Sequence, residues 1–284
     1  MDQMNRQLSL FGEEAKKMVK KVKASGGSQN PIVFRDYESY VAKFQNSNAP
    51  KTTDDTYTPK DVYEAVLQYV GENIDLSDKV ILRPFYPNGD YENAEYPENG
   101  VVIDNPPFSI FTKICKFYTE QDIPFFLFGP GLTILSVSKF CTSVFINQQI
   151  KFHNGAVVRC NFASNLFGDL SAMTSVRLNE LIKNCPSQSS QDSRLPRYVY
   201  PDEVISCSDM MIIAGGSVDF KVERRNTKNI KEIGHVKLFG GHLLTNSEIG
   251  ARKEELLSRV RKSNKIGEIV QMTEMERLIS ESLK

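Results

Sequence analysis

Cysteine is scarce in this chain, and it does not occur in the spacings that build disulfide frameworks or zinc sites. The five cysteines are odd in number and far apart, with no Cys-x-x-Cys pair: Cys115, Cys141, Cys160, Cys185 and Cys207. This pattern argues against a disulfide scaffold and a zinc site, so we expect reduced thiols. Of the three histidines, His235 and His242 have no cysteine or carboxylate cluster nearby, and we interpret them as loop residues. The sequence therefore predicts no bound metal.

Long apolar runs and net charge are also missing. No segment approaches the roughly 18 apolar residues of a membrane helix, and the first residues are too polar for a secretory signal. We therefore expect a cytoplasmic protein with no membrane partner. The formal net charge is +0. Any contact with a polyanion would therefore have to come from a local basic groove.

Apolar patterning predicts an α/β fold from about Thr53 onward. The chain has 284 residues, 40% hydrophobic and 25% charged, as in soluble globular proteins. Short apolar runs without alternation are typical of parallel strands covered on both faces, whose ligands bind beyond the carboxyl ends. The predicted elements are a helix over 61–70 with Val62, Val66, Leu67 and Val70 inward, a strand ending at Pro84, a strand over 101–104, a helix over 110–121 with Ile110, Ile114, Phe117 and Tyr118 inward, and a strand over 123–129.

The second half of the chain predicts further elements. The sequence HNG between two strand-like runs indicates a hairpin at Asn154 and Gly155. A helix is expected over 175–185, a loop over 186–196, a glycine-rich turn within FGGHLLT, and a charged helix from about Ile249.

The tetrapeptide Asn105, Pro106, Pro107 and Phe108 directly follows the apolar run 101–104. The amide oxygen of Asn105 and the carbonyl of Pro106 could accept both hydrogens of an exocyclic amine such as N6 of adenine. Two prolines stiffen the turn, and Phe108 offers a face on which a flipped base could stack, worth about 1–3 kcal/mol. We interpret these four residues as a catalytic set for methyl transfer to an amino nitrogen. The alternative is an ordinary strand that ends in a proline-rich turn.

A methyltransferase also needs a site for S-adenosylmethionine. The candidate is the glycine-bearing turn RPFYPNGDY at 83–91, which follows the strand KVIL. The sequence PNGD is also an ordinary β-turn, so its place just upstream of the NPPF strand is what favours a cofactor role.

Together these segments resemble the EcoRI-type adenine-specific DNA methyltransferases of bacteria and their phages. The resemblance rests on TYTPKDVYEAV at 56–66, RPFYPNGDY at 83–91 and VVIDNPPFSIF at 101–111. It implies a Rossmann-like fold, S-adenosyl-L-methionine as cofactor, and methylation of N6 of adenine in double-stranded DNA, with Asn105 to Phe108 at the target. The cofactor contacts that it implies are Tyr57, Thr58, Pro59, Pro84, Phe85 and Gly89.

Two positions depart from the family pattern. Arg83 stands where an acidic residue is usual, and Pro87 replaces a glycine. The short stretch between the cofactor turn and NPPF leaves no room for two intervening strand and helix units, so we expect a compact or abridged sheet. The carboxylate that grips the ribose is unassigned: Asp90 and Glu92 are the nearest options, and Asp104 could face the cofactor amine.

We expect three parts along the chain. Residues 1–50 form a flexible N-terminal appendage, 51–150 the methyltransferase core, and 151–284 the rest of the sheet with target recognition and a C-terminal α/β extension ending in a helix. Within the appendage, QLSLF resembles the pentapeptide by which bacterial replication and repair proteins dock on the sliding clamp; its expected contacts are Gln7, Leu8, Leu10 and Phe11. The same residues could instead begin an amphipathic helix that packs on the domain.

Two other functions fit the same residues. The acceptor could be an RNA base or a protein amide, since planar amines and amides of several kinds suit an Asn-Pro-Pro-aromatic turn. Alternatively, the altered positions Arg83 and Pro87 are consistent with a catalytically inactive, clamp-associated DNA-binding module.

Overall fold

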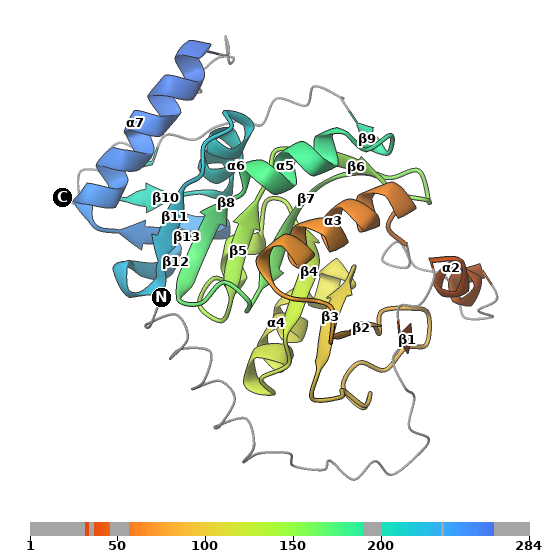
Figure 1. Cartoon of the computed structure of the whole chain (residues 1–284). Helices are drawn as coiled ribbons and strands as arrows, with labels where there is room; N and C mark the ends of the chain where they lie inside the picture. Colours follow the sequence, from red (N-terminus) through yellow and green to blue (C-terminus); the bar gives the residue numbers. More distant parts are fainter. Residues whose placement is uncertain (1–31, 34–36, 46–56, 190–199, 234–235, 264–284) are drawn as a thin grey trace.

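The protein is an α/β structure, as the apolar patterning predicts. The computed structural model describes residues 32–33, 37–45, 57–189, 200–233 and 236–263 (Figure 1). The strands are β1 (Ile32–Val33), β2 (Val80–Arg83), β3 (Gly100–Asp104), β4 (Phe125–Pro130), β5 (Thr142–Phe145), β6 (Gln149–Lys151), β7 (Val157–Ser164), β8 (Leu170–Thr174), β9 (Gln188–Ser189), β10 (Val204–Ile205), β11 (Lys221–Glu223), β12 (Thr227–Ile233) and β13 (Val236–Thr245). The helices are α2 (Tyr37–Gln45), α3 (Lys60–Asn73), α4 (Phe111–Glu120), α5 (Val176–Lys183), α6 (Cys207–Gly215) and α7 (Ser247–Ser263), with short 3-10 turns η2 (Phe108–Ile110), η3 (Ile134–Val137) and η4 (Arg224–Asn226).

The central sheet is mixed and largely parallel. Its strands lie in the order β1-β2-β3-β4-β7-β5-β8-β11. The pairs β2 with β3, β3 with β4, and β5 with β8 are parallel, whereas β7 runs antiparallel to both β4 and β5. The strands whose apolar runs predict a parallel arrangement, β2, β3 and β4, are parallel as expected. Beyond them the sheet is mixed, because the long strand β7 runs in the opposite direction between β4 and β5.

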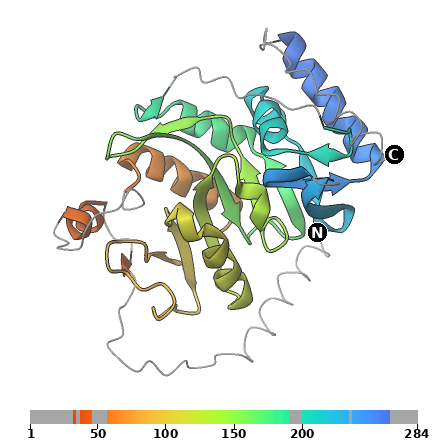
Figure 2. The same cartoon turned by 180° about the vertical axis from the view of Figure 1, so that it is seen from behind.

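Helices cover both faces of this sheet. Alternate residues of each strand point to opposite faces. Val101 and Ile103 belong to the buried cluster that includes side chains of α3 and α5, whereas Val102 belongs to the cluster that includes side chains of α4, α6 and α7. Figure 1 shows α3 and α5 on one face, and Figure 2, from behind, shows α4 on the other. Burial on both faces explains why β3 and β4 are apolar without alternation.

The predicted hairpin at Asn154 and Gly155 is confirmed. β6 and β7 pair antiparallel across this turn, and Gly155 adopts φ of 85°, which glycine reaches without steric cost. Residues 84–99 contain neither helix nor strand, so β2 passes directly to its parallel neighbour β3. The connection from the turn after β2 to the tetrapeptide is therefore short, as expected.

Part of the predicted N-terminal appendage belongs to the core. β1 pairs antiparallel with β2, and helix α2 buries Tyr40 and Phe44 against Tyr57. Aromatic contacts connect these side chains, with ring centroids 5.1 Å apart for Tyr40 and Phe44 and 5.6 Å apart for Phe44 and Tyr57. Helix α2 therefore packs against the segment that directly precedes α3.

The predicted orientation of Ile110 is wrong. Ile110 was expected to face inward from a helix, but it ends the 3-10 turn η2 and is 41% exposed. The helix α4 begins one residue later, so its apolar face starts at Phe111 instead.

His242 and its neighbours also differ from expectation. The glycine-rich segment is not a turn but the middle of β13, where Gly240 and Gly241 have φ of 81° and 74° and the pairing with β12 shifts register. A Cβ at Gly240 would collide with the carbonyl oxygen of Leu132, which explains the glycine. His242 is buried in this strand beside Tyr200, and burial lowers its pKa to about 4. His235 lies outside the described residues.

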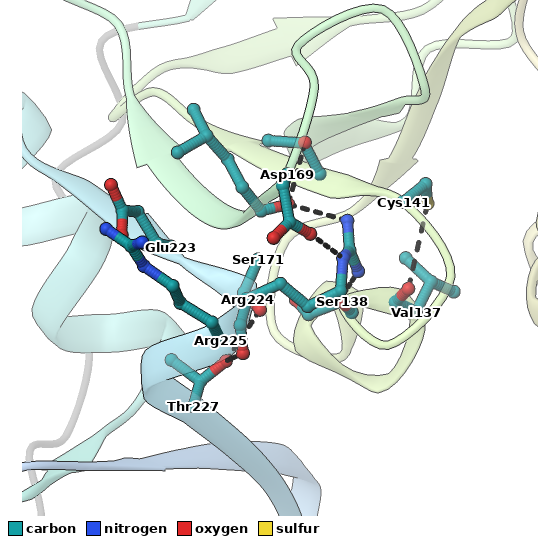
Figure 3. Close-up of polar contacts among 11 residues, drawn as sticks. Val137, Ser138, Cys141, Asp169, Ser171, Glu223, Arg224, Arg225 and Thr227 are labelled. Atoms are coloured by element: carbon teal, nitrogen blue, oxygen red, sulfur yellow. Dashed lines mark hydrogen bonds and ion pairs between the residues drawn. The ribbon is translucent and has the colours of Figure 1, made fainter.

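Arg224 connects several segments at the end of the sheet where the parallel strands β5 and β8 begin. Its guanidinium donates to the carbonyl oxygens of Leu170, at 2.8 Å, and of Ser138, and forms an ion pair with Asp169 at 3.1 Å (Figure 3). Because the main-chain nitrogen of Arg224 also donates to the carbonyl of Asp169, one residue connects β8, η3 and the end of β11.

We expect Arg224→Met to lower the free energy of unfolding by about 1–3 kcal/mol, because partly buried carbonyl groups would lose a charged donor. Chemical denaturation measures this change. The neighbouring Arg225 is 76% exposed and pairs only with Glu223 among the described contacts, so Arg225→Met should change the free energy by less than about 0.5 kcal/mol. Equal effects of the two substitutions would contradict the role given to Arg224.

Candidate active site

The four residues of the tetrapeptide begin at the carboxyl end of β3, inside the parallel part of the sheet. Val101, Val102, Ile103 and Asp104 are fully buried, and Asn105 is 5% exposed. The chain then leaves the sheet through the two prolines into η2. The prediction that the tetrapeptide directly follows a buried strand of the sheet is therefore confirmed.

Phe108 lies at the outer side of this turn. Its side chain is half-buried, and its ring meets the ring of Phe111 edge-on at a centroid distance of 6.3 Å. Pro107 precedes it with φ of −58° and ψ of 122°, an extended conformation that proline favours. A half-buried aromatic ring on a stiff turn keeps one part of its surface available for stacking.

The segment that precedes α3 reaches the same edge. Thr58 is fully buried, and its carbonyl oxygen accepts a hydrogen bond of 2.6 Å from the hydroxyl of Tyr37. The Thr58 hydroxyl has no hydrogen-bond partner among the described residues. Tyr57 stacks on His153 of the β6–β7 hairpin with centroids 4.2 Å apart, and Pro59 directly precedes the helix. An unsatisfied buried hydroxyl is costly, so Thr58 is a candidate to bind a ligand.

The turn after β2 packs against the end of β3. Phe85 is buried, and its main-chain nitrogen donates to Oδ2 of Asp104 at 2.9 Å. Further along, the nitrogen of Gly89 donates to the carbonyl of Tyr86 at 2.7 Å, and a Cβ at this glycine would collide with the carbonyl of Pro84. The tight turn itself therefore explains the glycine, because a side chain at this position would collide with the main chain.

The two carboxylates proposed for the ribose are engaged by their own surroundings. Asp90 accepts from the side chain of Asn93 at 2.7 Å and from nearby main-chain nitrogens, and these hydrogen bonds lower its pKa. Glu92 forms an ion pair with Lys113 at 2.7 Å and accepts from Tyr91. These contacts do not identify either residue as the carboxylate that binds the ribose of the cofactor.

Asp104 and Arg83 form a buried ion pair that sequence reasoning missed. Both side chains are fully buried, and Nε of Arg83 lies 2.9 Å from Oδ1 of Asp104. Burial raises the pKa of Asp104, and the guanidinium of Arg83 and the amides of Phe85 and Asn105 oppose this rise. The signal in the sequence was an arginine and an aspartate at the same ends of neighbouring strands.

Two tyrosines complete this cluster. The guanidinium of Arg83 stacks on the rings of Tyr40, at 3.4 Å from the centroid, and Tyr63, at 3.9 Å. The Tyr40 hydroxyl lies 2.9 Å from the carbonyl oxygen of Phe85 and 3.2 Å from Oδ1 of Asp104, and the Tyr63 hydroxyl donates to the carbonyl of Ile103 at 2.7 Å. Burial raises the pKa of Tyr40 well above 10, so its hydroxyl remains a donor.

Several predicted features are placed differently or lie outside the described residues. The clamp-like residues Gln7, Leu8, Leu10 and Phe11 are outside them. Lys253 in the charged C-terminal helix α7 is buried, and it donates to the carbonyl of Val204 at 2.8 Å. All five cysteines are free thiols.

Metal-binding groups, membrane-spanning helices and known relatives give no further indication of function. Within the described ranges, no group of three or more His, Cys, Asp and Glu residues could hold a metal ion, and no helix is both long and apolar enough to cross a membrane. Comparisons with models of known protein families, with curated proteins and with solved structures return no match.

Proposed function

We propose that this protein is an S-adenosylmethionine-dependent methyltransferase that acts on N6 of adenine in DNA. The observation that carries the proposal is the convergence of three separate segments at one sheet edge. Thr58, Phe85 and Asn105 come from different parts of the chain. The hydroxyls of Tyr37 and Tyr40, both on α2, donate to the carbonyl oxygens of Thr58 and Phe85, and the carboxylate of Asp104, next to Asn105, accepts from the main-chain nitrogen of Phe85. These are the segments on which the resemblance to adenine methyltransferases rests.

The chemistry at the target falls to the tetrapeptide. Adenine N6 is a weak nucleophile because its lone pair is delocalised into the ring. The amide oxygen of Asn105 and the carbonyl oxygen of Pro106 would orient the amine by accepting hydrogen bonds from its two hydrogens, while the prolines keep both acceptors in place. The partly exposed ring of Phe108 would stack on the flipped base. These features support an amino group on a planar ring as the group that receives the methyl.

Two parts of the site fit S-adenosylmethionine, whereas no carboxylate is assigned to its ribose or amine. The buried hydroxyl of Thr58, which lacks a partner among the described residues, and the turn from Pro84 to Gly89 are the groups that would hold S-adenosylmethionine. The cofactor would supply an already activated methyl group, so the protein needs to bind, orient and exclude water. Asp104 is fully buried and paired with Arg83, so it is not presented to a cofactor amine in this structure.

A second candidate is a catalytically inactive DNA-binding module. It is favoured because the three carboxylates considered for the cofactor, Asp90, Glu92 and Asp104, are all engaged by other groups of the protein. Against it stands the intact tetrapeptide, which places two acceptors and a half-buried aromatic ring on one stiff turn.

Incubation with isotopically labelled S-adenosylmethionine and DNA free of adenine methylation tests the proposal. Digestion and mass spectrometry of the nucleosides should find labelled N6-methyladenine. Parallel reactions with RNA and with protein extract separate the other acceptors. Cofactor binding without any labelled product would reject adenine in DNA as the acceptor, and absence of cofactor binding would favour the inactive module.

We also propose that QLSLF docks the protein on the bacterial sliding clamp. Deletion of residues 1–12 should weaken binding to purified clamp at least about tenfold, because Leu10 and Phe11 are the apolar anchors of such a peptide. Surface plasmon resonance measures the affinity, and turnover on short duplexes without clamp should stay the same. Equal clamp binding by both proteins would reject the docking role.

A further inference from the structure

The buried Arg83–Asp104 pair lies where two proposed subsites meet. Arg83 ends β2 and is followed by the cofactor turn, whereas Asp104 ends β3 and is followed by Asn105. Burying two charges is expensive, and such a pair is weak evidence for stability alone. Its position points to a role in the geometry of the site.

Asp104 uses both oxygens to hold the turn after β2. Oδ1 accepts from Nε of Arg83 at 2.9 Å, and Oδ2 accepts from the main-chain nitrogen of Phe85 at 2.9 Å. Because Asn105 is the next residue, the same carboxylate that fixes the cofactor turn also fixes the backbone from which the target amide projects. One side chain therefore sets the distance between the two subsites.

Tyr40 adds a third element to this arrangement. Its hydroxyl contacts the carbonyl oxygen of Phe85 as well as Oδ1 of Asp104, over a separation of 45 and 64 residues in sequence. A phenol has one hydrogen to donate, so the two acceptors share it. With its nitrogen bound to Asp104 and its carbonyl near Tyr40, Phe85 has both main-chain polar groups fixed, which orients the turn.

The guanidinium keeps these groups in register. It is stacked on the rings of Tyr40 and Tyr63, and its planar form leaves it little rotational freedom between them. Tyr63 differs from Tyr40 in one respect: its hydroxyl donates to the carbonyl of Ile103, whereas the hydroxyl of Tyr40 contacts Phe85 and Asp104.

We infer that Tyr40 and Asp104 are positioning residues that hold the cofactor turn against the target tetrapeptide, so that helix α2 sets the affinity for S-adenosylmethionine. The inference rests on the proposed function. It makes α2, from the part of the chain predicted to be an appendage, a component of the cofactor site that acts through Phe85 and does not itself touch the ligand.

The test compares Tyr40→Phe with Tyr63→Phe. Both tyrosines are fully buried, stack on Arg83 and lose one hydroxyl, so their melting temperatures should fall by similar amounts. Only Tyr40→Phe should weaken S-adenosylmethionine binding, by about 3- to 10-fold, which is the effect of one hydrogen bond. Isothermal titration calorimetry on the full chain measures the affinity.

Steady-state kinetics adds a readout that a loss of stability would not give. In Tyr40→Phe the KM for S-adenosylmethionine should rise while the KM for DNA stays within about twofold of the parent value, because the hydroxyl acts on the cofactor turn. Equal changes in both variants, or no change in Tyr40→Phe, would overturn the positioning role alone. Failure of the parent protein to bind S-adenosylmethionine would overturn the proposed function and the inference with it.

Discussion

Asn105→Ala is expected to reduce methyl transfer at least about 100-fold, while the affinity for S-adenosylmethionine changes little. The reason is that the amide oxygen orients the amine and stabilises the positive charge that develops on it, and removal of one preorganised polar group at a reacting atom typically costs about 100- to 1,000-fold. The cofactor contacts come from other segments, Thr58 and the turn after Pro84, which the substitution leaves in place.

Single-turnover assays with labelled cofactor measure this effect apart from product release. Asn105→Asp is the matched control: aspartate has the same shape and keeps an oxygen acceptor, so it should retain more activity than alanine. Both variants should fold, since Asn105 lies at the end of β3 and its neighbours Val102 and Ile103 supply the packing. Unchanged turnover in Asn105→Ala would reject the assignment of the tetrapeptide.

The elements that depend on local pattern could be predicted from the sequence. The helix around Val62 and Val66, the buried strand before Asn105 and the turn at Gly155 each follow from periodicity or from backbone conformations that a few residue types prefer. The sheet edge that carries the tetrapeptide follows in turn, because parallel strands end on the same side.

What could not be predicted depends on contacts between distant residues. The insertion of β7 between β4 and β5 is a choice of strand partners, and no local pattern encodes it. The burial of Arg83 depends on Tyr40, Tyr63 and Asp104, which come from three other elements. The sequence marked Arg83 only as a departure from a family pattern; the structure shows a partner of opposite charge beside it.

This pairing changes how the departure is interpreted. An arginine in place of an acidic residue would be harmful if the position had to present negative charge to a ligand. Here the arginine neutralises Asp104 inside the protein and stacks between two aromatic rings, so the charge is part of the scaffold at the end of β2. The altered residue is therefore no evidence by itself for loss of function.

Arg83→Met should lower the free energy of unfolding by about 3–5 kcal/mol, because Asp104 would remain as an uncompensated buried charge. Methionine is long enough to fill much of the space between the tyrosine rings, so most of the loss would be electrostatic. Urea denaturation at neutral pH measures it. The matched control is Arg177→Met, which breaks an exposed ion pair with Glu72 at 2.6 Å and should have little effect.

The double substitution Arg83→Met with Asp104→Asn completes the argument. Neither charge is then left buried, and the asparagine still offers an oxygen to the amide of Phe85, so a large part of the lost stability should return. Recovery of stability without recovery of S-adenosylmethionine affinity would separate the two roles of the pair, since a neutral cluster can pack well and yet hold the turn after β2 less firmly. If Arg83→Met proves as mild as Arg177→Met, the buried pair is not the electrostatic link between β2 and β3 that its contacts indicate.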